Sequence, residues 1–501
     1  MFDVAIIGCG PVGALAANLL GRKGLGVVVL EKELAHYPLP RAVHLDHEMM
    51  RLFQSAGVID RVLCDMADTD GHLHVGAGAQ AIRYMGTVGM ARPFGWSNDY
   101  FFYQPELETH LREGFAAMAN VTLKTGAEFT GLRQDDGTVY IAYTQDRAEQ
   151  SLTARWVIAC DGARSPVRKA LGVTLDDLDF EEPWLVVDAE VDGPVSFPSI
   201  SGVPESADLQ RLSVMMCDPR RPATIVPGRG NHRRWEFMLL PGEDDAAMMQ
   251  PDAVAALVEP WMKDVPHRII RAATYRFHGL VAHRWQVGNV FLAGDAAHQT
   301  PPFFGQGMCH GLRDVANLAW KMAAVARDKA DPAILDTYQG ERDPHVRGVI
   351  GAAVAAGRYI CELDPAKAKE RDAQMALRAA AKSGETAADL IPAIGAGLVA
   401  TGTAGAGVRF IQPILEDGRR LDDAVGDGWR LFAQGAVSTS GVTGIDLADL
   451  ADGGAVAGWL AARGAQAVLI RPDHYVFGTG TPETLLPLRV QMLGLNVETA
   501  A

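Results

Sequence analysis

The sequence predicts an α/β protein of several domains that begins with a strand, a helix and a second strand. At roughly 150 residues per domain, the 501 residues make about three domains with a large buried core. The apolar run FDVAII (2–7) suits a buried parallel strand, ALAANLLGRKG (14–24) has helical character, and VVVLEK (27–32) suits a second strand. With 48% apolar and 21% charged residues, the composition excludes disordered and fibrous chains.

Three glycines between the first strand and the helix have the G-x-G-x-x-G spacing of a dinucleotide-binding turn. Gly8 allows the tight turn, Gly10 lets the backbone approach a pyrophosphate, and Gly13 lets the helix pack closely on the strand. Glu31 ends the second strand, where a carboxylate can accept both ribose hydroxyls. Because strand, helix and acid are all in place, the motif indicates dinucleotide binding; a merely structural turn is the alternative.

Two later segments narrow the choice of dinucleotide. RWVIACDGARSPVR (155–168) is a strand that runs into Asp161 and a polar turn, and NVFLAGDAAH (289–298) is a strand that ends in Gly294 and Asp295. After Pro301 and Pro302 comes GQGM (305–308), which opens a helix. A carboxylate at a strand end before a glycine-rich helix start suits a ribityl hydroxyl and an electron-rich ring edge.

Charge and cysteine content limit the partners and the compartment. Lys and Arg number 46 and Asp and Glu 61, so the net charge of −15 argues against nucleic acid or an anionic membrane surface as a partner. Six widely spaced cysteines without a C-x-x-C favour a reducing cytoplasm and no disulfide framework. The uncharged stretch 390–408 is interrupted by Pro392 and rich in glycine, which indicates a connector rather than a membrane span.

Taken together, these motifs resemble those of the flavoprotein aromatic hydroxylases of the para-hydroxybenzoate hydroxylase type, over about residues 1 to 350. The closer likeness is to the 3-(3-hydroxyphenyl)propionate hydroxylase branch, carried by PRAVHLDHEMMRLF (40–53), YQPELETHL (103–111) and RRWEFMLLPGE (233–243). GLRDVANLAWK (311–321) and YQGERDPH (338–345) also fit that branch. The resemblance implies a noncovalent FAD, transient NADPH or NADH, dioxygen and a phenolic substrate, with hydroxylation through a flavin C4a-hydroperoxide.

The same resemblance implies how the domains are arranged. We expect a Rossmann-like FAD-binding domain, an interleaved β-sheet substrate domain, a helical and Gly-rich connector, and a thioredoxin-like C-terminal domain. The C-terminal domain has no cysteine, which excludes thiol–disulfide exchange there. The expected ranges are 1–70, 100–180 and 284–360 for FAD, 71–99 and 181–283 for substrate, 361–408 for the connector, and 409–501 for the C-terminal domain.

By resemblance, specific residues surround the cofactor. Arg41 and Gln104 would contact the pyrophosphate and ribityl regions, Asp295 the ribityl chain, and Asp161 the FAD and the nicotinamide cofactor. The ring itself would lie against the helix start, whose backbone N–H groups stabilise the negative charge of reduced flavin. The residues expected there are Pro302, Gly305, Gln306, Gly307 and Met308, of which Pro302, Gly305 and Gly307 are the catalytic candidates.

Several side chains keep two interpretations. His298 suits a structural or flavin-edge role or a proton relay, while His44 and His47 suit either a loop that reaches the cofactor or a solvated surface. Cys309, where the family commonly has Asn, suits packing or a helix-activated thiol. No metal site is predicted, because the histidines lack ligand spacing with acids or cysteines.

The sequence leaves the reaction partly open. The alternatives to phenol hydroxylation are a flavin oxidase, dehydrogenase or Baeyer–Villiger-type oxygenase on the same scaffold, or a non-catalytic flavin-binding regulator. A single-ring phenol with a short acid side chain is favoured, whose carboxylate could be bound by Arg92, Arg211 or Arg234. Arg41 and Arg164 favour NADPH without excluding NADH. The chain could also form a homodimer.

Overall fold

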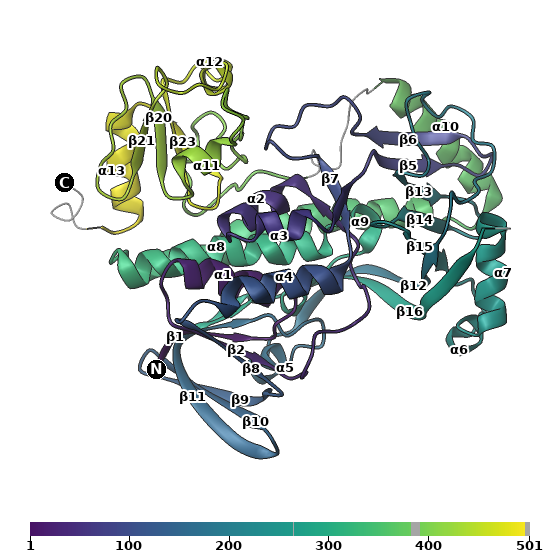
Figure 1. Ribbon diagram of the computed structural model, residues 1–501, viewed down its shortest axis with the longest axis horizontal. Coiled ribbons are helices and arrows are strands. Elements are labelled where there is room, and N and C mark those ends of the chain that lie inside the picture. The colour runs from purple at the N-terminus through teal and green to yellow at the C-terminus, as the bar shows by residue number, and fades with distance from the viewer. Residues whose placement is uncertain (264, 382–390, 496–501) are drawn as a thin grey trace.

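The computed structural model describes residues 1–263, 265–381 and 391–495 (Figure 1). In these residues the strands form four sheets, of which the two largest have eight strands each. The predicted α/β class is therefore confirmed. Residues 382–390, within the predicted connector, and 496–501, at the end of the predicted C-terminal domain, lie outside the described residues.

The first sheet contains the predicted strand–helix–strand unit. β1 (Phe2–Ile7) lies between β2 (Val27–Glu31) and β11 (Ala148–Ala159) and is parallel to both. α1 (Pro11–Arg22) connects β1 to β2, as the G-x-G-x-x-G turn predicts. The other strands of this sheet are β8 (Val121–Thr125), β9 (Glu128–Asp135), β10 (Thr138–Gln145), β17 (Gln286–Val287) and β18 (Val290–Leu292).

Long helices cover this sheet. α1 packs against α4 (Gln104–Ala116) and α8 (Gly307–Arg327), and α8 is followed by α9 (Thr337–Ile360). Most residues of α8 are buried, because α1 covers one side of the helix and the C-terminal domain lies against another (Figure 1). Further helices are the short α2 (His47–Ser55), α3 (Ile59–Leu63), α5 (Pro166–Ala170) and α6 (Asp245–Met248), and the longer α10 (Pro365–Ala381).

The second sheet is built mainly from the middle of the chain, and its strands pair across long sequence separations. β12 and β16, which lie towards one edge of the sheet, form the longest antiparallel pair in the described residues. In order across the sheet the strands are β19 (His298–Gln299), β16 (His267–Ala282), β12 (Leu175–Val191), β15 (His232–Met238), β14 (Ala223–Pro227), β13 (Leu212–Met216), β5 (Gly71–Val75) and β6 (Ala81–Gly86).

The two faces of the second sheet differ in character. One face is apolar and packs against α7 (Pro251–Met262), with Leu185 and Val187 on β12 beside Trp235 and Phe237 on β15. Side chains alternate along a strand, so the residues between these point the other way. The opposite face, which we call the polar face, is turned away from α7, and its Trp184 and Met238 belong to the apolar core that also contains β1 and α8. Its polar or charged side chains include Asp188 (β12), His232, Arg234 and Glu236 (β15), His72 and His74 (β5), Arg83 (β6), Ser213 (β13), Thr224 (β14) and Arg271 (β16).

A small three-stranded sheet holds the segment after Arg41 against the first domain. β3 (His44–Asp46) pairs antiparallel with β7 (Asp99–Phe102), and β4 (Met66–Asp68) pairs with the other edge of β7. This pairing brings His44 next to Asp99, although 55 residues separate them in the sequence.

The C-terminal domain, described here over residues 409–495, has its own apolar core around Phe410, Phe432 and Val468. Its central strand β20 (Arg430–Ala433) is parallel to one neighbour and antiparallel to the other. The thioredoxin-like assignment stays a prediction. The remaining elements are α11 (Leu421–Val425), β21 (Thr443–Asp446), α12 (Ala455–Ala461), β22 (Ala467–Ile470), β23 (Val476–Gly480) and α13 (Pro482–Met492).

The predicted domain ranges stay predictions as well, and β12 runs without a break across the predicted boundary at residue 180. The Gly-rich stretch is irregular in its described part, 391–408, as expected for a connector. Among the helices in the described ranges, none has the length and apolar character needed to cross a membrane.

Candidate active site

The glycine turn between β1 and α1 leaves space in front of the helix N-terminus. A Cβ on Gly8 would lie 2.4 Å from the carbonyl oxygen of Cys160, and one on Gly13 would lie 2.0 Å from that of Gly8. A Cβ on Gly10 would meet no atom of the described residues within 4 Å. The turn is therefore closed towards the sheet and open beside Gly10, as close approach of a pyrophosphate requires.

Glu31 lies at the end of β2, facing the same turn. Its buried carboxylate accepts hydrogen bonds from the backbone N–H groups of Cys9, at 2.7 Å, and Glu33, at 2.9 Å. These bonds fix the orientation of the carboxylate at the sheet edge, and each oxygen keeps a second lone pair for a ribose hydroxyl. The ribose contact itself stays a prediction.

The structure brings Arg41 and Gln104 together. The Gln104 side-chain oxygen accepts from the backbone N–H groups of Arg41, at 3.0 Å, and Ala42, at 2.8 Å. The Arg41 side chain is exposed and its guanidinium lies 5.4 Å from the centre of the Tyr37 ring. Gln104 therefore positions the backbone of this segment and leaves the Arg41 cation available for an anionic ligand.

The two predicted strand-end acids differ in their surroundings. Asp161 accepts from the backbone N–H of Val167 at 3.0 Å, and burial raises the pKa of its carboxyl. Asp295 is exposed, whereas Gly294 next to it is buried with a φ of +61°.

Sequence reasoning missed Asp314, which organises this strand end. Its buried carboxylate accepts from the backbone N–H of Gly294, at 3.0 Å, and from Arg342, at 2.9 Å, and is bonded to His298, at 2.8 Å. His298 is fully buried in this network, which favours the structural interpretation over a proton relay. Only the position of Asp314, on the helix that follows Gly-Gln-Gly-Met, could have marked it.

Residues 301–308, which we call the Pro-Gly loop, join the second sheet to α8. Pro302 begins a short turn of 3-10 helix, and Gly305 ends it with a φ of +63°. A Cβ on Gly305 would lie 2.3 Å from Nδ1 of His44, so only glycine fits there. In the described chain α8 begins at Gly307 without a side-chain cap, so the first N–H groups of this helix face the loop without a capping acceptor.

His44 and His47 are both buried, so the solvated-surface interpretation of these residues is wrong. His44 is bonded through Nε2 to Asp99 at 2.9 Å. Burial lowers its pKa, but the bond to Asp99 raises it, and the net shift is upward. The His47 ring packs on Phe94, with ring centres 4.3 Å apart, and burial lowers its pKa to about 4.

Arg313 connects three segments beneath the Pro-Gly loop and was also missed. It donates through Nη1 to the side-chain oxygen of Gln306 at 3.0 Å and through Nε to Glu48 at 2.8 Å, and it also bonds Asp46. Gln306 is buried and makes this internal bond, and its contact with the cofactor stays a prediction.

The polar face of the second sheet contacts the Pro-Gly loop: the Trp184 ring lies 5.9 Å from that of Phe303. Arg234 donates to Asp188 at 2.8 Å and to the carbonyl oxygens of Pro40, at 2.8 Å, and Arg41, at 2.6 Å. Two residues further along β15 is Glu236, whose pKa burial raises to about 6, although Arg234 lowers it. The face therefore presents a carboxyl group that changes charge near neutral pH.

The three arginines predicted as possible partners of a substrate carboxylate are Arg92, Arg211 and Arg234, and each lies in a different environment. Arg234 uses its nitrogens to clamp the sheet to the segment at Pro40 and Arg41, as described above. Arg211 is exposed and pairs with Asp68 and Asp70. Arg92 is exposed. None of them stands out as the anchor.

The prediction of no metal site stays a prediction. In the described part of the chain, His44, His72 and Asp99 bring potential ligand atoms within 4.8 Å of one another. They come from β3, β5 and β7, so no sequence motif could show this grouping.

Cys309 packs in the core, and burial raises the pKa of its thiol, which is opposite to activation by a helix N-terminus. All six cysteines lie in the described residues, and each is a free thiol.

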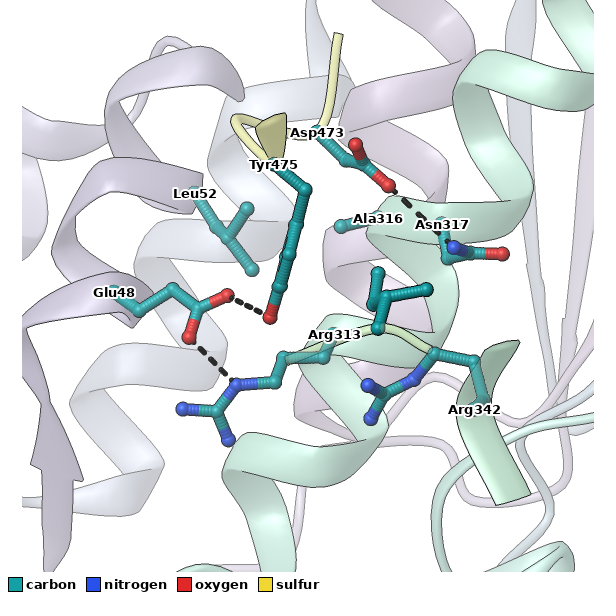
Figure 2. A pocket seen from close by; sticks show the side chains of 9 residues that line it. Glu48, Leu52, Arg313, Ala316, Asn317, Arg342, Asp473 and Tyr475 are labelled. Atoms are coloured by element: carbon teal, nitrogen blue, oxygen red, sulfur yellow. Dashed lines mark hydrogen bonds and ion pairs between the residues drawn. The ribbon is translucent and has the colours of Figure 1, made fainter. Parts of the chain in front are cut away.

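A small cavity lies between α8 and the C-terminal domain (Figure 2). Its volume is ≈ 10 Å³, about enough for one water molecule and too small for an aromatic substrate. Figure 2 shows Glu48, Arg313 and Tyr475 around it, with Glu48 bonded to both of the others.

These features fit FAD. The open side of Gly10 has room for a pyrophosphate, the Glu31 carboxylate is fixed beside the same turn, and the uncapped start of α8 offers N–H groups suited to an electron-rich ring edge. FAD, when bound, accepts reducing equivalents from a nicotinamide cofactor and activates dioxygen.

Comparisons with known proteins agree with this geometry. The family model described as an FAD binding domain matches residues 1–353. The chain is 37% identical to a 3-(3-hydroxy-phenyl)propionate/3-hydroxycinnamic acid hydroxylase of Burkholderia vietnamiensis, over 87% of this chain and 81% of the relative. It is 34% identical to a probable NADH-specific resorcinol 4-hydroxylase of Rhodococcus jostii, over 95% and 91%.

Solved structures share the fold. The flavin-dependent monooxygenase PieE, in complex with FAD and substrate, has a TM-score of 0.81 at 22% identity and covers 99% of both chains. The p-nitrophenol 4-monooxygenase of Pseudomonas putida has a TM-score of 0.68 at 25% identity, covering 78% of this chain and 96% of its own. The chain thus belongs to the FAD-binding-domain family, in the branch of flavin-dependent aromatic hydroxylases that contains the 3-(3-hydroxyphenyl)propionate hydroxylases.

Proposed function

We propose that this monooxygenase hydroxylates a single-ring phenol that carries a short acidic side chain, with NAD(P)H and dioxygen as co-substrates. The observation that carries this proposal is the polar face of the second sheet, which holds both an acid and cations and contacts the Pro-Gly loop through Trp184 and Arg83, at Phe303 and Phe304. The relatives named as hydroxyphenylpropionate hydroxylases act, by their names, on phenols of this kind.

For the cofactor, we propose the arrangement that the sequence predicts. Gly8, Gly10 and Gly13 form the pyrophosphate turn, and Glu31 binds the ribose. The open space beside Gly10 and the uncapped start of α8 support this arrangement. Further contacts come from Arg41, Gln104, Asp161, Gly294, Asp295, Gln306 and Met308, while Pro302, Gly305 and Gly307 border the ring.

Glu236 is the proposed base that removes the phenolic proton. The residue before it on the same face, Arg234, contacts the carbonyl of Arg41. The next residue on that face, Met238, pairs in register with Trp184, whose ring lies 5.9 Å from that of Phe303 in the Pro-Gly loop. On β15, Glu236 thus lies between one residue that contacts the Arg41 segment and one that pairs with a neighbour of the Pro-Gly loop. With a pKa of about 6, its carboxyl is largely ionised at neutral pH.

Arg83 is the proposed partner of the substrate's acid group. It lies on β6 with its guanidinium 5.8 Å from the centre of the Phe304 ring, and it donates to the hydroxyl of Tyr359 at 3.5 Å. A cation beside the Phe304 ring of the Pro-Gly loop supports this assignment. A planar guanidinium binds a carboxylate through two parallel hydrogen bonds.

A product-identified screen of phenols tests the proposed function. We expect one atom from labelled dioxygen in the product of an acidic phenol, and NAD(P)H oxidation that this phenol accelerates at least about tenfold, or about 1.4 kcal/mol of barrier. We expect this acceleration because flavin reduction without a bound phenol would consume NAD(P)H and dioxygen without forming product. Oxidised product without labelled oxygen would indicate an oxidase or dehydrogenase, and an inserted ring oxygen would indicate a Baeyer–Villiger reaction.

Replacing Arg83 with Met tests the acidic side chain. We expect KM for the acidic phenol to rise by about ten- to a hundredfold, since a hydrogen bond to a charged group contributes roughly 1.5–3 kcal/mol. KM for a neutral phenol of the same size should stay within about twofold, because no carboxylate contact is lost. An equal rise in KM for both phenols would contradict the assignment.

The choice of reductant and the assembly stay proposals. Arg41 and Arg164 support NADPH, while the relative from Rhodococcus jostii is named as NADH-specific. Comparing kcat/KM for the two nicotinamides decides between them. A homodimer and a cytoplasmic location stay predictions.

A further inference from the structure

A chain of four buried side chains connects the C-terminal domain to the Pro-Gly loop. The hydroxyl of Tyr475 donates to Oε1 of Glu48 at 2.8 Å, and Nε of Arg313 donates to Oε2 of the same carboxylate at 2.8 Å. Arg313 then donates through Nη1 to Gln306 at 3.0 Å. Figure 2 shows the first two links, with Tyr475 reaching down from the C-terminal domain to Glu48.

The charges in this chain are held in place. Burial raises the pKa of Glu48, but Arg313 and Arg409 lower it, and the net shift is downward. Burial lowers the pKa of Arg313, but Asp46 and Glu48 raise it well above its usual range. A buried ion pair is stable only when its hydrogen bonds are made, so the position of one head group depends on the others.

Other contacts hold the same domain without reaching the loop. Arg51 pairs with Asp422, and Ser55 bonds to Nε2 of His474 at 2.7 Å. Docking of the C-terminal domain therefore does not itself require Tyr475. Two residues of that domain contact Glu48: Tyr475 donates the hydrogen bond, and Arg409 forms an ion pair at 3.5 Å that Tyr475→Phe would leave in place.

We propose that Tyr475 is a positioning residue for the Pro-Gly loop, acting through Glu48, Arg313 and Gln306. The docked C-terminal domain thereby sets the environment of the flavin ring. This gives a domain without redox cysteines a role in the reaction. The inference rests on the FAD site described above, but not on the identity of the phenol.

The test compares two variants that each remove one hydroxyl from the domain interface. In full-length holoenzyme, Tyr475→Phe should shift the visible absorbance and the midpoint potential of the bound flavin and weaken FAD binding about three- to tenfold, as expected for one hydrogen bond. Ser55→Ala should leave the absorbance, the potential and the FAD affinity at wild-type values. Both variants should lower Tm by a similar amount, because each loses one hydrogen bond at the interface. Tyr475→Phe should also have no added effect when Gln306 is already Ala.

If Tyr475→Phe lowers Tm but leaves the flavin properties unchanged, the contact of Tyr475 is structural only and the proposal is overturned. Additive effects with Gln306→Ala would likewise overturn the proposed route. Should Tyr475→Phe not fold, Glu48→Gln breaks the same chain and is expected to shift the flavin potential; an unchanged potential would overturn the proposal. These readouts use flavin alone, so a failed phenol screen does not affect them.

Discussion

Gly10→Val is expected to yield a folded protein that no longer retains FAD. The backbone at Gly10 has a φ of −72°, which valine adopts, and a Cβ there meets no atom of the described residues within 4 Å. The side chain would instead fill the space through which a pyrophosphate approaches α1. We expect the FAD dissociation constant to rise by at least about a hundredfold, or about 2.7 kcal/mol.

Fluorescence titration of the apoprotein with FAD measures this change. Apoprotein Tm should fall only slightly, because a poorer cap costs about 1 kcal/mol. Gly131→Val is the matched control, since Gly131 lies in a strand of the same sheet and its Cβ also meets nothing in the described chain within 4 Å. FAD binding at the wild-type level by Gly10→Val would show that the pyrophosphate lies elsewhere.

Glu236→Gln is expected to lower kcat by about a hundredfold or more at pH 8, the typical contribution of a general base. The wild-type activity should decline as the pH falls through about 6, where Glu236 becomes protonated. The variant should lack this decline. Stopped-flow measurement of hydroxylation across about pH 5 to 9 checks both expectations, with Glu190→Gln, on the neighbouring strand, as the control.

The same substitution should stabilise the fold. Because burial raises the folded-state pKa of Glu236 from 4.5 to about 6, its contribution to stability is fully present below pH 4.5 and is lost as the pH rises through 6. Gln resembles the protonated form, so Glu236→Gln should gain up to about 2 kcal/mol in free energy of unfolding above about pH 6 and nothing at about pH 4. A variant less stable at about pH 8 than the wild type would contradict the burial of this carboxyl.

The sequence by itself determined the parts of this protein that are contiguous in the chain. The turn from Gly8 to Gly13, with its flanking strands and helix, is specified by local backbone requirements, so a pattern of glycines and apolar residues was enough to predict it. The Gly-Gln-Gly-Met start of α8 was legible for the same reason.

Only the tertiary structure decided which side chains meet across the site. Glu236, Arg83 and Asp314 come from separate elements, and strand pairing and helix packing over long sequence separations bring them to the candidate active site. Burial then changes their chemistry: the same residue type is a solvated surface group in one place and a carboxyl with a raised pKa in another. His44 and His47 illustrate this, since the sequence leaves open whether they are exposed, whereas the pairing of β3 with β7 buries His44 and packing on Phe94 covers His47.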